Sequence, residues 1–255
     1  MSKIIQEVEC PGFIAVRSRT VFHSMNSIMK ATISVPGQSS DRLTFTKALL
    51  YCGVLSSLWY VFANIYVPTR YEGYSMMSLT VSELSAIGAP TRDLWVALII
   101  AYPVLFAAFG MGVLRSADGS KRLRAAGWLI IGYSVFNIYW PPMHQRGMET
   151  SLTDALHIAW AAVTVMLMIA MMVTGARAFD RNFRIYTISS VAALFVFGLL
   201  TGMDGPKIPT NEPTPLMGLW ERINIGVFLL WVIILSNKLL QRTRERDSKE
   251  VIETS

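Results

Sequence analysis

The sequence predicts an all-α membrane protein, a six-transmembrane-helix bundle, from three observations. Of the 255 residues, 53% are hydrophobic and only 16% are charged, whereas soluble domains usually carry about 25% charged residues. Six stretches are nearly free of charge, and each approaches the roughly 20 residues with which a helix crosses a bilayer core. These stretches lack the alternation of polar and apolar residues that is typical of membrane barrel strands.

The six charge-poor stretches define the predicted membrane domain. They are 48–69, 94–114, 125–145, 155–176, 185–203 and 215–237. The last is interrupted only by Glu221 and Arg222. Because backbone polar groups must be satisfied internally in hydrocarbon, we expect helices throughout. We therefore predict a membrane domain at 45–240, a poorly ordered cytoplasmic tail at 1–44, and a charged cytoplasmic C-terminal tail at 241–255.

The positions of the basic residues predict the orientation in the membrane. Most Lys and Arg residues lie within 1–44, in the turns 115–124 and 177–184, and after Asn237. Cytoplasmic segments of membrane proteins are enriched in Lys and Arg, so we expect both termini in the cytoplasm. The outer connections are then 68–93, 142–153 and 203–214. This distribution accounts for the net charge of +6, so we expect membrane lipids as partners and no nucleic acid.

The first outer connection, PTRYEGYSMMSLTVSELSAIGAPTRD, carries signals of a short helix. Thr80 and Glu83 have the T-x-x-E spacing of a capping box, and Gly88 and Pro90 end the run that follows. We expect a short amphipathic helix, about 81–87, that lies on the outer membrane surface or folds back over the bundle. Further helix caps are expected at Thr91, Ser151 and Thr214.

Polar and ionisable side chains gather at the predicted outer ends of the helices. Asp154 and His157 are three residues apart and share a helix face, and Glu221 lies about 9 Å into the last helix. Ionisable groups inside a membrane cost about 2.5–3.5 kcal/mol each at mid-depth, so they are expected to face partners. The candidate catalytic residues are Glu221 and His157. The candidate ligand-binding residues are Glu83, Arg92, His144, Arg146, Asp154, Asp204, Arg222 and Asn224.

A purely structural role competes with the functional one at each position. The capping box explains Glu83, and the helix dipole favours Asp154 in a first turn. Glu221 can belong to an ion pair, and His144 can be a surface group. His157 can be a hydrogen-bonded structural histidine.

Two kinds of hydrolytic chemistry are candidates for this cluster, one with a zinc ion and one with a serine nucleophile. A zinc hydrolase needs three His or carboxylate ligands and an open position, which His144, Asp154 and His157 could supply. No H-E-x-x-H motif supports such a site, and no other cofactor is indicated. Serine catalysis has less support because G-x-S-x-G is absent, although Ser82 and Ser85 lie near the cluster.

Five segments resemble a bacterial inner-membrane family known as domain-of-unknown-function family nine-nine-eight. They are YEGYSMMSLTVSELSAIGAPTR, WPPMHQRG, LTDALHIAW, FGLLTGMD and WERINIGVFLLWV. The resemblance covers roughly 45–237 and implies a polytopic helical membrane protein with no settled activity. The family's recurring residues fall at Glu83, Pro90, His144, Gly147, Asp154, His157, Asp204 and Glu221.

Three functions follow as hypotheses, of which the first is preferred. A polar pocket on the extracytoplasmic face, covered by the 68–93 loop, would bind a lipid headgroup or a small polar ligand. The alternative is a metal-assisted hydrolase of membrane lipids or amides, with Glu221 as general base. A small transporter ranks last, because the ionisable residues stay at one end whereas transport sites usually lie near the midplane. The ligand and the oligomeric state are left open.

Overall fold

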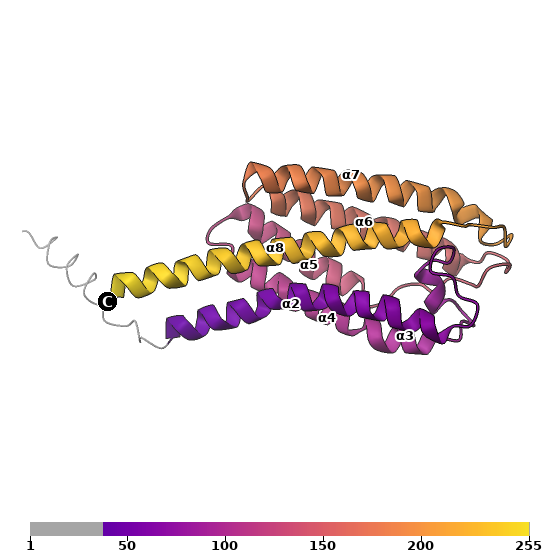
Figure 1. The fold of residues 1–255 in the computed structure, drawn as a ribbon, viewed down its shortest axis with the longest axis horizontal. Coiled ribbons are helices and arrows are strands. Elements are labelled where there is room, and N and C mark those ends of the chain that lie inside the picture. The colour runs from indigo at the N-terminus through magenta and orange to yellow at the C-terminus, as the bar shows by residue number, and fades with distance from the viewer. Residues whose placement is uncertain (1–37, 255) are drawn as a thin grey trace, which may run out of the picture. The chain divides into compact units, whose positions relative to one another are not determined.

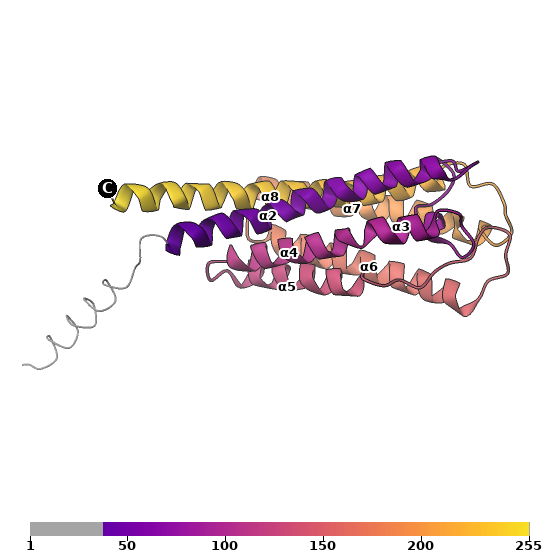
Figure 2. The same ribbon diagram turned by 90° about the horizontal axis from the view of Figure 1, so that it is seen from below.

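The computed structural model describes residues 38–254, and the regular secondary structure of this range is helical apart from one isolated bridge between Ile87 and His144. The part from Arg42 onward forms one compact unit. Its long helices run side by side (Figures 1 and 2). They are α2 (Gln38–Tyr66), α3 (Arg92–Ile99), α4 (Ala101–Arg115), α5 (Lys121–Phe136), α6 (Leu152–Ala176), α7 (Arg181–Asp204) and α8 (Met217–Thr254). Single 3-10 turns occur at η1 (Val67–Arg70), η2 (Ser82–Ser85) and η3 (Gly205–Lys207).

Five helical segments are long and apolar enough to cross a membrane. They are Asp41–Arg70, Arg92–Arg115, Leu152–Ala176, Arg181–Lys207 and Met217–Ser248. The second combines α3 and α4, which are separated at Ile100 because Pro103 cannot donate a hydrogen bond to the preceding turn. The molecule therefore has the character of an α-helical, multi-pass membrane protein.

The third predicted span, 125–145, is not among these five segments, because its helix is shorter in the structure. Helix α5 has 16 residues and ends at Phe136, and the chain from Ile138 to Pro142 is not helical. Pro141 and Pro142 remove two backbone donors, and a residue before proline disfavours the helical conformation. The stretch contains no Asp, Glu, Lys or Arg, but the absence of charge does not show where the helix stops.

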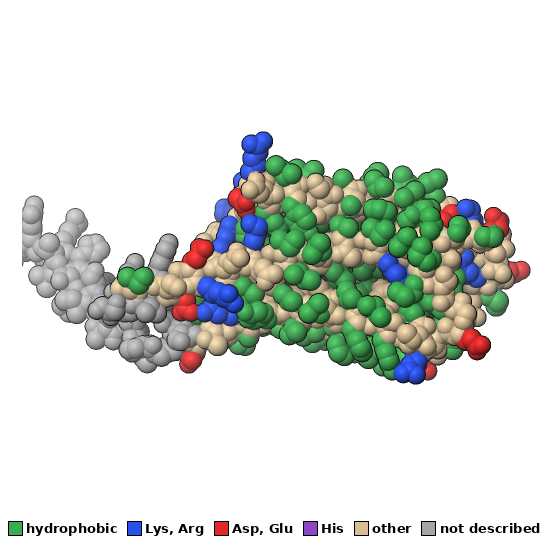
Figure 3. All heavy atoms as spheres, in the orientation of Figure 1, with side chains coloured by type: hydrophobic (Ala, Val, Ile, Leu, Met, Phe, Trp, Pro, Cys, Tyr) green, Lys and Arg blue, Asp and Glu red, His purple; other side chains and the backbone are tan. Residues whose placement is uncertain are grey.

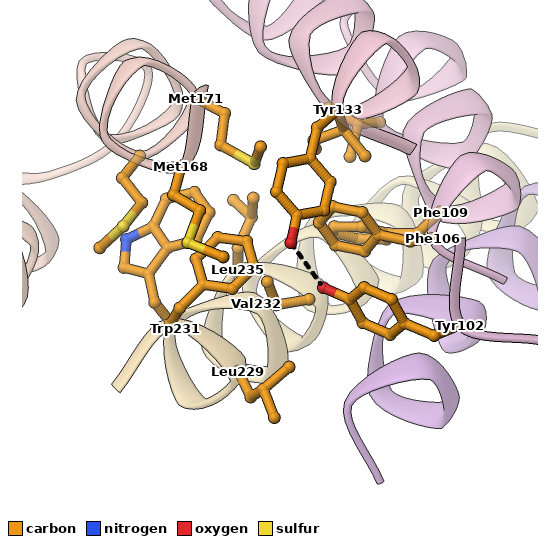
Figure 4. Packing of buried hydrophobic residues seen from close by; sticks show 14 of the residues in the cluster. Tyr102, Phe106, Phe109, Tyr133, Met168, Met171, Leu229, Trp231, Val232 and Leu235 are labelled. Carbon is orange, nitrogen blue, oxygen red and sulfur yellow. Dashed lines mark hydrogen bonds between the residues drawn. The ribbon is translucent and has the colours of Figure 1, made fainter. Parts of the chain in front are cut away.

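The helices pack around an aromatic core. Helix α4 packs against α5, α5 against α6, and α7 against α8. Phe106, Phe109 and Phe228 are buried. The hydroxyls of Tyr102 and Tyr133 lie 3.4 Å apart within the same core (Figure 4). Helix α2 packs closely against α4 because Gly112 of α4 has no side chain. A Cβ at this position would lie 3.0 Å from the backbone of Leu50 in α2.

The two ends of the bundle differ in construction. One end, here called the turn end, contains the α4–α5 and α6–α7 turns together with the start of α2 and the end of α8. The other, the loop end, contains the connections 67–91, 137–151 and 205–216. Hydrophobic side chains cover most of the visible middle of the bundle, and charged side chains gather toward both ends (Figure 3). This pattern fits a molecule whose middle lies in lipid.

Several local predictions needed correction. The helix expected at 81–87 is one 3-10 turn, η2, in which Glu83, Leu84 and Ser85 are buried. Thr91 precedes α3, but its hydroxyl donates to the Leu84 carbonyl at 2.8 Å and does not cap the helix. Both differences arise because this connection is largely buried against the protein, which the spacing of its apolar residues does not show.

The first and last long helices extend beyond the predicted apolar stretches. Helix α8 begins at Met217, and the Thr214 hydroxyl donates to the Ser78 carbonyl instead of capping it. Helix α8 then continues through 241–254, so the predicted charged tail is helical there. Helix α2 starts at Gln38, within the predicted 1–44 tail, whose first 37 residues lie outside the described range.

Candidate functional site

The connection 71–91 lies against the first turn of α8. The Leu219 amide donates to the Met77 carbonyl at 3.0 Å. A Cβ on Gly218 would lie 2.2 Å from the Leu79 carbonyl oxygen, which is inside any normal contact distance. Glycine at 218 therefore permits the loop backbone to touch the helix.

Arg222, one turn after Gly218 in α8, binds the same connection through its guanidinium. Its guanidinium donates to the carbonyls of Met76 and Leu79 at 2.8 and 2.9 Å, to Asn64 Oδ1 at 3.0 Å, and to the Tyr74 hydroxyl at 2.6 Å. Burial raises the pKa of Tyr74 above its ordinary value despite the neighbouring guanidinium. The phenol thus stays protonated and donates to the Thr80 carbonyl at 2.6 Å.

Glu83 and Arg146 join the connection 67–91 to the connection 137–151. Arg146 Nε lies 2.5 Å from Glu83 Oε1, and Nη2 lies 3.1 Å from Oε2. The predicted capping box is also present, because the Thr80 amide donates to Glu83 at 2.6 Å and the Glu83 amide donates to Thr80 Oγ1 at 3.3 Å. The ion pair is bidentate and largely buried, which makes it a fixed strut between the loops.

His144 and Asp154 form a second side-chain pair at the loop end. The His144 amide and Nδ1 lie 2.7 and 2.8 Å from the two Asp154 carboxylate oxygens. Ser151 caps α6 as predicted, with a reciprocal capping box to Asp154. Asp154 therefore organises the α6 N-terminus and the loop that precedes it.

His157, Ser82 and Glu221 make a continuous polar chain across three segments. His157 Nδ1 lies 2.7 Å from the Pro141 carbonyl oxygen, and Nε2 lies 3.1 Å from Ser82 Oγ. Ser82 Oγ is in turn 3.4 Å from Glu221 Oε1, while Glu221 Oε2 accepts the Val81 amide. His157 is only 8% exposed, whereas Ser82 is partly exposed.

A groove of about 620 Å³ opens between α5 and α6 beside this chain. Its walls, which define the α5–α6 groove, are Val135, Phe136, Ile138, Tyr139, Pro141, Leu156, Ala159, Trp160 and Val163. Pro141 also holds His157 through its carbonyl, and the Trp160 ring centroid is 5.7 Å from that of His157. Within the described residues, Trp160 Nε1 is the buried side-chain polar atom that has no hydrogen-bond partner.

Three candidate ligand-binding residues do not join the cluster. Asp204 pairs with Lys207 in its own segment at 2.7 Å. Asn224 donates to the Leu194 carbonyl at 2.7 Å and ties α8 to α7. Arg92 begins α3, and its side chain makes no hydrogen bond or ion pair within residues 38–254.

The predicted metal ligands are only partly brought together. His144 and Asp154 are in contact, but both ring nitrogens of His157 face other partners, namely Pro141 and Ser82. In the part of the chain that is described, no three His, Cys, Asp or Glu side chains are grouped so as to hold a metal ion. The side chains present therefore do not fit a three-ligand site in this arrangement.

Sequence reasoning did not place two groups of this cluster. The sequence places Ser82 only as a serine near the cluster, and it gives no indication of a role for the Pro141 carbonyl. The proline pair after α5 was the available signal, because an early helix end frees carbonyl groups to accept other donors. No sequence motif indicated that Ser82 would meet His157, which is 75 positions away.

Together, the fold and the site define a class: helical, multi-pass membrane proteins whose bundle is closed at one end by ion-paired connections. Within that class, a family profile described as "Protein of unknown function (DUF998)" matches residues 54–237. The chain belongs to this family, the one that its sequence segments resemble. Neither a curated protein nor a solved structure matches the chain.

Proposed function

We propose that this protein is an integral protein of the bacterial inner (plasma) membrane that binds a membrane lipid at its loop end. The lipid's polar part would lie at Ser82 and His157, and an acyl chain would lie in the α5–α6 groove. The observation that carries the proposal is the shared residue: Pro141 lines the apolar groove and also holds His157.

The chemistry of the groove supports a lipid over a water-soluble ligand. All its walls are apolar or aromatic, and Val135, Tyr139 and Leu156 are 62%, 72% and 48% exposed on a part of the molecule that faces lipid. A volume of about 620 Å³ is within the range of about 300–1,000 Å³ that is usual for small-molecule sites.

The free Trp160 Nε1 supports a ligand with an acceptor at this depth. Buried tryptophan N–H groups usually have a partner, and this one has none among the described residues. A lipid ester or amide carbonyl would supply the missing acceptor. Glu83 and Arg146 are already paired with each other, as are His144 and Asp154, so these four side chains support the walls of the site instead of the ligand.

The orientation is part of the proposal. The turn end carries Lys121, Arg122, Arg177 and Arg181, and basic residues favour the cytoplasmic side. Both termini would then be cytoplasmic and the loop end extracytoplasmic. Cysteines introduced at Asn211 and at Ser120 should react with an impermeant thiol reagent in intact cells at Asn211 only. Reaction at Ser120 alone would reverse the orientation.

Lipid mass spectrometry of the protein purified in mild detergent tests the binding site. One lipid class should be enriched over the bulk membrane. Ala159→Trp, which fills the groove, should remove that enrichment. Ile188→Trp on the exposed face of α7 is the matched control and should keep it. A lipid profile equal to the bulk membrane, or one unchanged by Ala159→Trp, would overturn the proposal.

A further inference from the structure

The protonation of His157 follows from its two contacts. A carbonyl oxygen only accepts hydrogen bonds, so His157 Nδ1, 2.7 Å from the Pro141 carbonyl, must carry a proton. In the neutral ring, Nε2 is then the acceptor. Ser82 Oγ lies 3.1 Å from this nitrogen and donates its proton to it.

This is the arrangement of a nucleophile and its base. Serine becomes nucleophilic when an adjacent base accepts its proton, and the base works best when a third group orients it. Here Ser82 is the hydroxyl, His157 the base and the Pro141 carbonyl the orienting group. The arrangement needs no sequence motif, since such sites are recognised by geometry and not by position in the chain.

Ser82 is held in place from both sides. The amide of the preceding residue, Val81, donates to Glu221, and the carboxylate of the following residue, Glu83, is bound by Arg146. Ser82 itself stays partly exposed between buried neighbours. A rigid, accessible hydroxyl is what a nucleophile requires.

We propose that Ser82 and His157 cleave an acyl ester or amide bond of a lipid whose chain lies in the α5–α6 groove. This activity rests on the proposed lipid site. It uses water as the co-reactant and releases a fatty acid.

The reaction balances as two acyl transfers. Ser82 Oγ attacks the acyl carbonyl carbon while its proton moves to His157 Nε2. The bond from that carbon to the leaving oxygen or nitrogen breaks, and His157 returns the proton to the leaving group. Water then attacks the Ser82 ester and gives its proton to His157. Loss of the fatty acid restores the Ser82 hydroxyl, with the proton returned from His157.

Glu221 serves as a positioning residue in this scheme. Ser82 has one hydroxyl proton, which cannot be donated to His157 and Glu221 at once. The shorter contact is with His157, at 3.1 Å against 3.4 Å. Glu221→Gln keeps an acceptor for the Val81 amide, so activity should fall less in this variant than in Glu221→Ala, which keeps none. Equal loss in both variants would show that the carboxylate itself is needed.

A fluorophosphonate probe tests the pair directly in the full-length protein in lipid nanodiscs. Such probes phosphonylate activated serines. Peptide mass spectrometry should find the label on Ser82. Ser82→Ala and His157→Gln should each lose it; the glutamine can still donate to Pro141 but cannot take the proton. Ser75→Ala, at an exposed serine of the same connection, should leave the label intact.

The outcomes separate this activity from lipid binding. An unlabelled Ser82 in wild-type protein that still carries an enriched lipid would overturn the activity and leave the binding site standing. A labelled Ser82 without an enriched lipid would overturn the lipid site and with it the cleavage of a lipid, and would leave only an activated serine paired with His157. Fatty-acid release from vesicles of phosphatidylethanolamine and phosphatidylglycerol should be lost in Ser82→Ala, with thermal unfolding recorded to confirm that the variant is folded. Release that persists in the folded variant would overturn the proposal.

Discussion

The loop end and the turn end of the bundle use charge in opposite ways. At the turn end, Arg246 pairs with Asp118 while both side chains are about half exposed, at 47% and 50%. At the loop end, Arg146 and Glu83 are 14% and 7% exposed. Exposed pairs contribute about 0–1 kcal/mol, whereas breaking a buried pair costs about 3–5 kcal/mol.

The difference follows from the lengths of the connections. The α4–α5 and α6–α7 turns are short, so the helices themselves fix the geometry there. The connections of the loop end are long, with few helical hydrogen bonds to hold them. Buried polar contacts replace that order, so the buried charged groups at this end mainly hold the connections in place.

Breaking the Glu83–Arg146 pair should have the largest effect. Glu83→Ala leaves the Arg146 charge buried without its partner, and we expect a loss of about 3–5 kcal/mol in the free energy of unfolding. Arg146→Ala should cost a similar amount, and the double variant less than the sum. Denaturant unfolding in detergent micelles measures all three. Strict additivity would show that the two side chains do not act as a pair.

Gly218→Ala should have the second-largest effect on stability. The added methyl group would meet the Leu79 carbonyl oxygen at 2.2 Å, and overpacking of this kind costs about 1–3 kcal/mol. Gly226→Ala is the matched control on the same helix, since a Cβ there meets nothing within 4 Å. It should be neutral or stabilising by up to about 1 kcal/mol. Equal effects at both positions would refute the close contact between loop and helix.

Ser151→Ala should have a smaller effect. It removes the hydroxyl that accepts from the Thr153 amide at 3.2 Å, and the loss of such a cap costs about 0.5–2 kcal/mol. Thermal unfolding measures it, with Thr150→Ala at the exposed neighbouring position as control. A Ser151→Ala variant as stable as the control would argue against the cap.

A substitution at the turn end, Asp180→Asn, should change the stability least. The Lys238 ammonium, 3.0 Å away, lowers the pKa of Asp180. A lowered pKa adds stability above pH 3.8, the ordinary value, and this contribution disappears as the pH falls through the folded-state pKa. Asp180→Asn should therefore shift the melting temperature slightly at pH 7 and not at all below both pKa values. A larger shift at acid pH would contradict the sign.

The sequence predicted the helical class, the family and the two capping boxes, because these depend on local signals. Apolar length reveals spans, and the Thr80–Glu83 and Ser151–Asp154 spacings reveal caps. Contacts between distant segments have no such signal. The spacing of charged residues along the chain could not show that Asp204 would turn to Lys207, or that Ser82 would meet His157.

The Pro141–Pro142 pair has a further consequence for the surrounding bilayer. Because α5 is only 16 residues long, it spans about 24 Å at 1.5 Å per residue, and non-helical backbone follows it on the same flank as the groove. Non-helical backbone at membrane depth is tolerated only against protein or in a cavity. In the proposed function, this flank is where a lipid of the surrounding leaflet would enter the α5–α6 groove without first passing through water.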